Sequence, residues 1–222
     1  TGRVMSVSRR YELLSWASRR PERYVIEDDY DWEFRFAGMP IPALESIDIK
    51  SKVIYISTFS KSLSSALRVA FMILPEPLME RFNEKLGFLA NTVSALDQIA
   101  LARLIESGDY EKHLNRYKKQ SKATRDALIG ALDSSSLGSR MSIEEKDSGL
   151  HFVLSVESQR SEGTIAQLAR EDGIMLAPLS SYLLCTHDPA SEHGIARFVM
   201  QYDGLDLEAV QAVVGILEKA VG

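Results

Sequence analysis

The sequence predicts an α/β fold, a mostly parallel sheet with helices, followed by a smaller α+β domain. Two apolar, β-branched runs, Val53–Ser57 and Val69–Leu74, have the composition of strands buried inside a sheet. A helical pattern over residues 6–20 precedes a further strand at Tyr24–Glu27, and this alternation of helix and strand is typical of α/β domains. After Pro75 the order of helices and strands is that of an α+β domain.

Two domains are expected in the 222 residues. We assign residues 1–100 to part of a large domain and residues 101–222 to a small C-terminal domain. The boundary is expected inside a long helical region, between residues 85 and 110.

The first helix, residues 6–20, can be capped by Ser6 or Ser8, and Pro21 ends it. One face of this helix is expected to carry Tyr11, Leu14 and either Ala17 or Ser18. An acidic cluster follows the strand Tyr24–Glu27, at the end of a sheet where ligands bind in open α/β proteins.

The remaining elements follow from the same patterns. Residues 37–51 predict a loop with one helical turn near Leu44. Further helices are expected at residues 76–107, with a break near Gly87, and at 110–132, 164–171 (capped near Ser161) and 206–220. Further strands are expected at residues 139–143, 150–156 and 196–202, with a strand and a loop at 173–184.

The composition limits the classes of function. The net charge of −5 lacks the basic excess of a nucleic-acid-binding domain. A single cysteine, Cys185, excludes an internal disulfide framework and indicates a reducing, cytoplasmic location. No apolar run is long enough to span a membrane, and no signal peptide is visible.

The loop between the strands Val53–Ser57 and Val69–Leu74 carries a lysine and an arginine among hydroxyl groups. Lys61 and Arg68 would lie between apolar strands, where cations need an anionic partner. A cation among hydroxyl groups suits a phosphate, and a lysine among apolar strands can lose its proton, as a Schiff-base lysine must. The hydroxyl groups near the lysine belong to Thr58, Ser60 and Ser62.

Two blocks of sequence together resemble one family. The lysine loop reads TFSKSLSSALRVAF, and residues 25–35 read VIEDDYDWEFR. They are similar to the TFSKxLxPxLRxGY and EDDYDSEF blocks of the aminotransferase-like domain of MocR-subfamily GntR transcription regulators, a class I/II, fold-type I pyridoxal 5′-phosphate (PLP) domain. The resemblance implies PLP as the cofactor and part of a fold-type I large domain.

The resemblance assigns roles to residues of both blocks. Lys61 would carry PLP as a Schiff base and would act as the base in an aminotransferase. Asp28 would pair with the pyridine nitrogen and make the ring a better electron sink, and Tyr30 would bind the phenolic oxygen of the cofactor. Arg68, with Thr58 and Ser60, would bind the cofactor phosphate.

Some of these residues have structural alternatives. Asp29 and Asp31 are neighbours of Asp28 and can be confused with it. The hydroxyl groups of Ser60 and Ser62 can equally bind their own backbone in a turn.

Arg197 lies in the segment GIARFVM and resembles the C-terminal arginine that binds a substrate carboxylate. Its alternative is a strand arginine that pairs with a local acid. Gly149-Leu150-His151 resembles the family's GLH strand start, and a structural role is expected for His151. The other histidines (His113, His187 and His193) show no metal-ligand spacing, so no metal site is expected.

Three of the departures from the family pattern matter for the site. Ser65 and Ala70 replace a proline and a glycine near the arginine, and Trp32 replaces a serine after DDYD. The resemblance covers only the C-terminal part of the family's domain. We therefore expect a piece of a longer protein whose N-terminal part holds the rest of the cofactor site and a DNA-binding winged helix-turn-helix.

These observations favour an effector domain of a bacterial GntR/MocR-type regulator, in which PLP or an amino compound bound to it biases DNA binding. A true aminotransferase is the alternative, because the same residues suit both. A third interpretation is a chain that folds and dimerises but binds PLP weakly or not at all. The resemblance also implies a homodimer and an amino acid or amine as the small-molecule partner.

Overall fold

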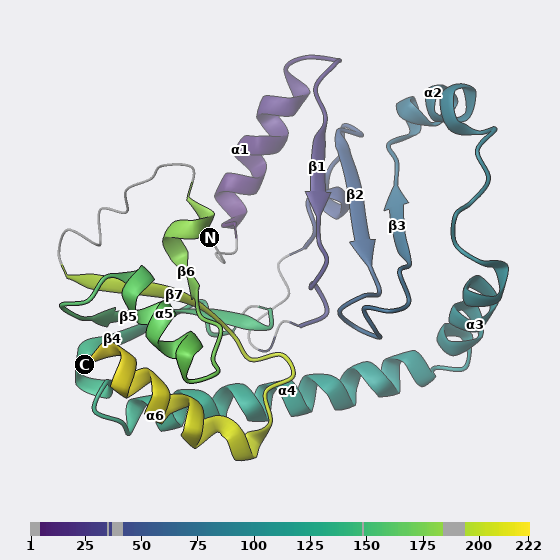
Figure 1. The fold of residues 1–222 in the computed structure, drawn as a ribbon. Helices are drawn as coiled ribbons and strands as arrows, with labels where there is room; N and C mark the ends of the chain where they lie inside the picture. Colours follow the sequence, from purple (N-terminus) through teal and green to yellow (C-terminus); the bar gives the residue numbers. More distant parts are fainter. Residues whose placement is uncertain (1–4, 35, 37–41, 148, 184–193) are drawn as a thin grey trace. The chain divides into compact units, whose positions relative to one another are not determined.

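The computed structural model describes residues 5–34, 36, 42–147, 149–183 and 194–222. The described chain divides into two compact units, residues 5–115 and 116–222 (Figure 1). The division lies within helix α4 (Asp109–Asp133). The predicted domain boundary after residue 100 stays a prediction.

Helix α1 (Val7–Ser18) opens the first unit. The Ser6 side chain accepts a hydrogen bond of 3.4 Å from the Arg9 backbone N–H, so Ser6 is the cap rather than Ser8. The buried face carries Arg10, Leu14 and Ala17. Of the residues expected to share one face, Leu14 and Ala17 are buried, whereas Tyr11 is 57% exposed.

The sheet of the first unit has three strands, β1 (Val25–Asp28), β2 (Val53–Thr58) and β3 (Ala70–Ile73). β1 and β2 are parallel, and β3 pairs antiparallel with β2. This sheet is therefore mixed rather than mostly parallel. The physical reason is the short connection over residues 59–69, because a parallel return needs a longer crossover, usually a helix. The predicted helical turn is confirmed as the 3₁₀ helix η1 (Glu45–Ile47).

The core of this unit lies between α1 and one face of the sheet. Leu14 packs with Leu44 and Val53, and Leu13, Val25 and Ile47 surround them. The alternating positions Val53, Tyr55 and Ser57 of β2 are buried, as expected for a strand with one covered face.

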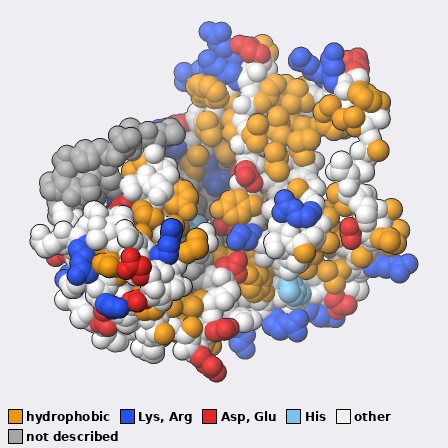
Figure 2. Space-filling view, viewed as in Figure 1, with side chains coloured by type: hydrophobic (Ala, Val, Ile, Leu, Met, Phe, Trp, Pro, Cys, Tyr) orange, Lys and Arg blue, Asp and Glu red, His pale blue; other side chains and the backbone are white. Residues whose placement is uncertain are grey.

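Strand β3 is exposed, so the prediction of a second buried strand is wrong. Phe71, Met72 and Ile73 are 39%, 44% and 44% exposed. Apolar composition predicts the strand but not which element covers it, and these side chains stay partly exposed although the Phe71 ring contacts the rings of Phe59 and Tyr55. The helices α2 (Glu76–Leu86) and α3 (Ala95–Glu106) bury no side chain either. Figure 2 shows the resulting hydrophobic surface over the sheet and α2.

The elements of the second unit are β4 (Met141–Glu144), β5 (His151–Glu157), α5 (Glu162–Glu171), β6 (Ala177–Pro178), β7 (Ile195–Gln201) and α6 (Val210–Val221), with 3₁₀ helices at Gly138–Arg140, Leu179–Tyr182 and Leu207–Ala209. The four strands form an antiparallel sheet in the order β4-β5-β7-β6. Phe152, Leu154, Ala196 and Phe198 are buried on one face of the two central strands. Ile165 of α5 is fully buried, and α5 packs against α6.

Most predicted boundaries of this unit agree with the structure. Ser161 caps α5 by accepting a hydrogen bond of 3.2 Å from the Thr164 backbone N–H. The strand predicted within residues 173–184 is only Ala177–Pro178 and continues into a 3₁₀ helix.

The break predicted near Gly87, in the first unit, is also present. Gly87 ends α2, and a non-helical connection leads to α3.

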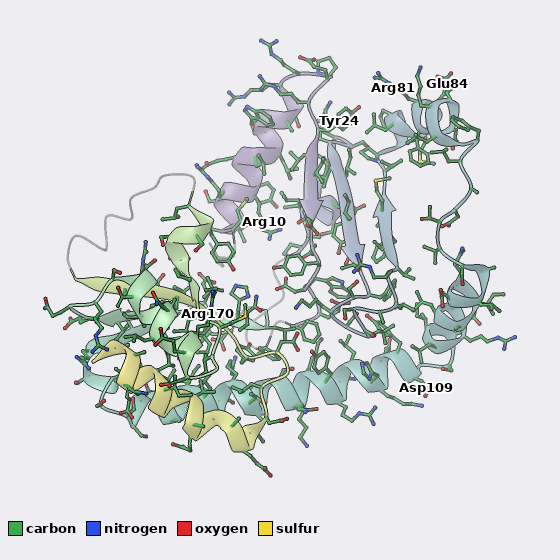
Figure 3. The ribbon with its side chains drawn as sticks, viewed as in Figure 1. Arg10, Tyr24, Arg81, Glu84, Asp109 and Arg170 are labelled. Carbon is green, nitrogen blue, oxygen red and sulfur yellow. The ribbon has the colours of Figure 1, made fainter. Side chains whose placement is uncertain are left out.

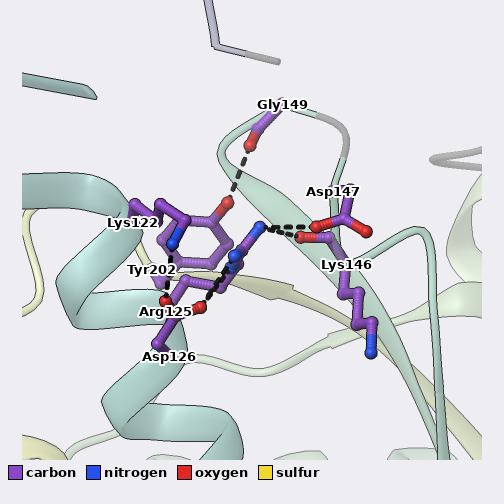
Figure 4. A network of polar contacts seen from close by, with 7 residues as sticks. All are labelled: Lys122, Arg125, Asp126, Lys146, Asp147, Gly149 and Tyr202. Carbon is purple, nitrogen blue, oxygen red and sulfur yellow. Dashed lines mark hydrogen bonds and ion pairs between the residues drawn. The ribbon is translucent and has the colours of Figure 1, made fainter. Parts of the chain in front are cut away.

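A buried arginine supports the turn before β5. The Arg125 guanidinium donates to the Lys146 backbone oxygen at 2.8 Å and to Asp147 Oδ1 at 3.0 Å (Figure 4). Tyr202 Oη donates to the Gly149 backbone oxygen at 2.7 Å. Gly149 has a φ of +68°, which glycine adopts without the strain of a side chain. These contacts fix the start of the strand that the GLH motif predicts.

In the part of the chain that the structure describes, no helix is both long enough and apolar enough to cross a membrane.

Candidate functional site

The acidic block and the lysine loop lie at the same edge of the three-stranded sheet. β1 and β2 are parallel, so their carboxyl ends meet at one edge, and Asp28 pairs with Ile56. The Asp29 backbone N–H donates to the Ile56 oxygen at 2.9 Å, which continues the pairing beyond β1. β3 runs antiparallel, so Arg68, which precedes it, lies at this edge too. The structure thus brings together the residues predicted for the cofactor, namely Asp28, Tyr30, Thr58, Ser60, Lys61 and Arg68.

The lysine loop is closed at its base by hydrogen bonds. Thr58 Oγ1 donates to the Val69 backbone oxygen at 3.0 Å, and the Phe59 backbone N–H donates to the same oxygen at 3.1 Å. Thr58 Oγ1 also accepts from the Ser60 backbone N–H at 3.1 Å and lies 2.9 Å from Ser60 Oγ. The Thr58 hydroxyl therefore has a structural role in the loop whether or not it meets a ligand.

The lysine loop is not the buried cation site that the sequence predicts. Lys61 and Arg68 are exposed, whereas the sequence predicts a lysine enclosed by apolar strands. The loop extends beyond the sheet edge, and for this reason the strands do not enclose it. Arg68 has a φ of +49°, a left-handed conformation that is uncommon for a residue with a side chain and is enriched at functional sites.

The acidic residues of the block have different surroundings. Glu27 is buried and accepts hydrogen bonds from the Leu44 and Glu45 backbone N–H groups at 2.8 and 3.1 Å. Arg10, which Figure 3 labels at α1, lies 3.3 Å from Glu27 Oε1. Glu27 therefore supports the end of β1.

The two candidate aspartates are distinguished by their contacts. Tyr55 Oη donates to Asp29 Oδ2 at 3.4 Å, whereas Asp28 is exposed at the strand end. Burial and the Asp29 carboxylate raise the pKa of Tyr55 to about 12. Tyr30 is 42% exposed, and Trp32, which replaces the family's serine, is 47% exposed.

The residues at this edge fit PLP by the chemistry of their donor and acceptor groups. A carboxylate matches a protonated ring nitrogen, an amine matches an aldehyde, and a guanidinium with hydroxyl groups matches a phosphate. The assignment of each residue to its part of the cofactor stays a prediction.

Sequence reasoning missed a buried polar cluster beside the lysine. Tyr110 Oη donates to Glu33 Oε1 at 2.9 Å and lies 3.0 Å from Ser62 Oγ. His113 Nε2 lies 2.9 Å from the Ser62 backbone oxygen. Tyr110 and His113 are three positions apart on α4 and so share a face, but no local pattern says what that face meets.

Arg197 lies on β7, in the second unit. The residues beside it, Ala196 and Phe198, are buried, whereas Arg197 is half-buried on the opposite face. Its backbone N–H donates to Glu162 Oε1 at 3.0 Å, and Ser180 Oγ donates to Glu162 Oε2 at 2.6 Å. Its predicted role as a ligand of a substrate carboxylate stays a prediction.

The other predicted residues are placed as follows. His151 begins β5 and is half-buried. Cys185, His187 and His193 lie outside the described residues. Among the residues that are described, no group of three or more His, Cys, Asp or Glu side chains could bind a metal ion.

The family described as aminotransferase class I and II matches residues 19–210. The chain belongs to this family. Its similarity to MocR-type regulators, predicted from the lysine and acidic blocks, is confirmed by two curated relatives. It is 43% identical over 183 residues to the uncharacterized HTH-type transcriptional regulator YhdI of Bacillus subtilis, covering 82% of this chain and 39% of that protein. It is 30% identical over 219 residues to the probable rhizopine catabolism regulatory protein MocR of Rhizobium meliloti, covering 99% and 43%.

Solved aminotransferases share the fold of this class I and II domain. Kynurenine aminotransferase of Pyrococcus horikoshii matches with a TM-score of 0.80 and 22% identity, over all of this chain and 53% of that chain. The α-aminoadipate aminotransferase LysN of Thermus thermophilus matches with a TM-score of 0.76 and 25% identity, over 97% and 54%. These matches confirm the predicted fold class. The chain spans about two fifths of the length of the two regulators and about half of these enzymes.

Proposed function

We propose that this chain is part of the PLP-binding effector domain of a GntR/MocR-type transcription regulator. The observation that carries the proposal is the meeting of the acidic block and the lysine loop at one sheet edge. The relatives named as HTH-type regulators support the regulatory role. DNA would be bound by a winged helix-turn-helix outside this chain, and the protein would act as a homodimer in the cytoplasm.

Bound PLP would supply an aldehyde that captures amines reversibly and a ring that withdraws electrons. Lys61 would bind the cofactor covalently through its amine. Asp28 would keep the ring nitrogen protonated, and Tyr30 would donate a hydrogen bond to the ring oxygen. Arg197 would bind the carboxylate of an amino acid effector.

The phosphate would be bound by the lysine loop. Arg68 would supply the charge, because a guanidinium binds phosphate in a bidentate manner. Ser60 would donate from its hydroxyl, and the Thr58 hydroxyl, which closes the loop, would lie beside it.

The test is the affinity of the complete protein for its operator DNA, with and without PLP and a panel of amino acids and amines. We expect PLP with one of these compounds to change DNA affinity about tenfold, a coupling of about 1.4 kcal/mol. Lys61→Ala should abolish the change while leaving basal DNA binding intact. An unchanged affinity under all conditions would contradict the proposal.

A true aminotransferase is the second candidate, because the solved proteins with this fold are aminotransferases. In that case Lys61 would also transfer the proton of the bound amino acid. Formation of a 2-oxo acid from an amino acid, in steady turnover and lost in Lys61→Ala, would favour the enzyme over the regulator.

A further inference from the structure

The Tyr110 side chain connects the two sequence blocks that carry the proposed function. Its phenol oxygen contacts Glu33 of the acidic block at 2.9 Å and Ser62 of the lysine loop at 3.0 Å. A phenol has one proton, and the carboxylate is the stronger acceptor. Tyr110 therefore donates to Glu33, and the Ser62 hydroxyl donates to Tyr110.

The two side chains that Tyr110 contacts through its hydroxyl are shielded from water, and the Tyr110 side chain itself is half-buried. Glu33 is 3% exposed, and Ser62 is fully buried. Buried polar groups depend on one another for hydrogen bonds, and loss of one partner leaves the others unsatisfied. The cluster therefore favours a single position of residue 62 relative to the acidic block.

Helix α4 binds Ser62 through two different groups. Tyr110 contacts the hydroxyl, and His113 Nε2 lies 2.9 Å from the backbone oxygen of the same serine. Both side chain and main chain of Ser62 are thus fixed. Lys61 is the adjacent residue, and its Cα is about 3.8 Å from that of Ser62 because the peptide geometry is rigid.

The loop is also supported on the other side of the lysine. The Phe59 ring packs edge-on against the Tyr110 ring, with a centroid distance of 5.8 Å. The Phe59 backbone N–H donates to the Val69 oxygen. Contacts of Tyr110 therefore bracket Lys61, at residue 59 by its ring and at residue 62 by its hydroxyl.

We propose that Tyr110 is a positioning residue that sets the place of Lys61 relative to the acidic block through Ser62 and Glu33. The proposal rests on the proposed function in so far as Lys61 binds PLP. The Lys61 side chain is exposed, and in this proposal the contacts of Tyr110 fix the backbone next to it at Ser62. The cluster lies outside the residues assigned to the cofactor itself.

The test uses Tyr110→Phe in the complete protein. This variant retains the ring and its packing on Phe59 but removes both hydrogen bonds. Amide hydrogen exchange of residues 59–68 without PLP should become about tenfold faster. The dissociation constant for PLP should rise about tenfold. The pH midpoint of the visible absorption band of the lysine-bound cofactor should also shift, because the surroundings of the lysine nitrogen change.

Tyr117→Phe is the matched control. Tyr117 lies on the same helix and donates its phenol proton to a carboxylate, Asp203, in the second unit. We expect this variant to leave loop exchange and PLP affinity within about twofold of the unmodified protein. Unchanged exchange, affinity and band midpoint in Tyr110→Phe would overturn the proposal, as would equal effects in the two variants.

Two further outcomes remain informative. If the unmodified protein binds no PLP, the proposed function fails, and the exchange measurement still tests the positioning role. If Tyr110→Phe does not fold, Ser62→Ala replaces it, because it removes the hydroxyl contact with a small change of volume. An exchange rate of residues 59–68 equal to that of the unmodified protein in Ser62→Ala would then overturn the proposal.

Discussion

Ser57 Oγ donates a hydrogen bond of 2.9 Å to the backbone oxygen of Asp29, and so ties the end of β2 to the end of β1. Ser57 is 1% exposed, so this bond lies away from water. Asp29 follows the predicted cofactor residue Asp28, and Ser57 precedes the lysine loop. One side chain thus helps to fix the two blocks at a common edge.

Ser57→Ala should destabilise the first unit. The Asp29 oxygen loses a buried donor, which costs about 1–3 kcal/mol in free energy of unfolding. Denaturant unfolding of the complete protein measures the change. Ser46→Ala is the control, since its exposed hydroxyl donates locally to Ala43 and its loss should cost less than about 0.5 kcal/mol. Equal losses in the two variants would contradict the account.

Glu27→Ala should lower the free energy of unfolding more than Ser57→Ala does. The substitution leaves Arg10 buried without its carboxylate and removes the acceptor of the Leu44 and Glu45 N–H groups. Removal of one partner of a buried pair costs about 3–5 kcal/mol. The exposed pair of Arg9 and Glu12 offers the comparison, and Glu12→Ala should change the unfolding free energy by less than about 1 kcal/mol. A loss of less than about 1 kcal/mol in Glu27→Ala would show that the buried pair of Arg10 and Glu27 is not structurally important.

Arg125→Lys should destabilise the second unit although it retains the charge. A lysine cannot reproduce the forked contacts to Asp126, Asp147 and the Lys146 oxygen. We expect a loss of about 2 kcal/mol in unfolding free energy. In the control, Lys122→Ala, only an exposed ion pair with Asp126 is removed, and the loss should be below about 0.5 kcal/mol. A tolerated Arg125→Lys would mean that charge alone stabilises the turn before β5.

Stability should fall as the pH rises from 10 towards 12. Burial raises the pKa of both Tyr55 and Tyr110 to about 12, from an ordinary value of 10.0. In this window the folded protein retains protons that the unfolded chain loses, so each increase in pH favours unfolding. Denaturant unfolding across the window, compared between the unmodified protein and Tyr110→Phe, measures the effect. The variant should show a smaller fall, and an identical fall would contradict the contribution of Tyr110.

The site edge could be predicted from the sequence, whereas the cluster behind it could not. Parallel strands place their carboxyl ends together, so an acidic block after one strand and a lysine after the next imply one site. The contacts of Tyr110 join positions 77 and 48 residues apart, and no local pattern encodes such pairings. The exposure of Phe71 and Ile73 was equally unpredictable, because apolar composition does not specify which element covers a strand.

The most direct test of the central claim is the site of covalent attachment of PLP. The complete protein is mixed with PLP, reduced with borohydride and digested, and the modified peptide is sequenced by mass spectrometry. The account predicts one pyridoxyl group on Lys61, and none in Lys61→Ala. A modification that falls on exposed lysines at random, or one that persists unchanged in Lys61→Ala, would contradict it.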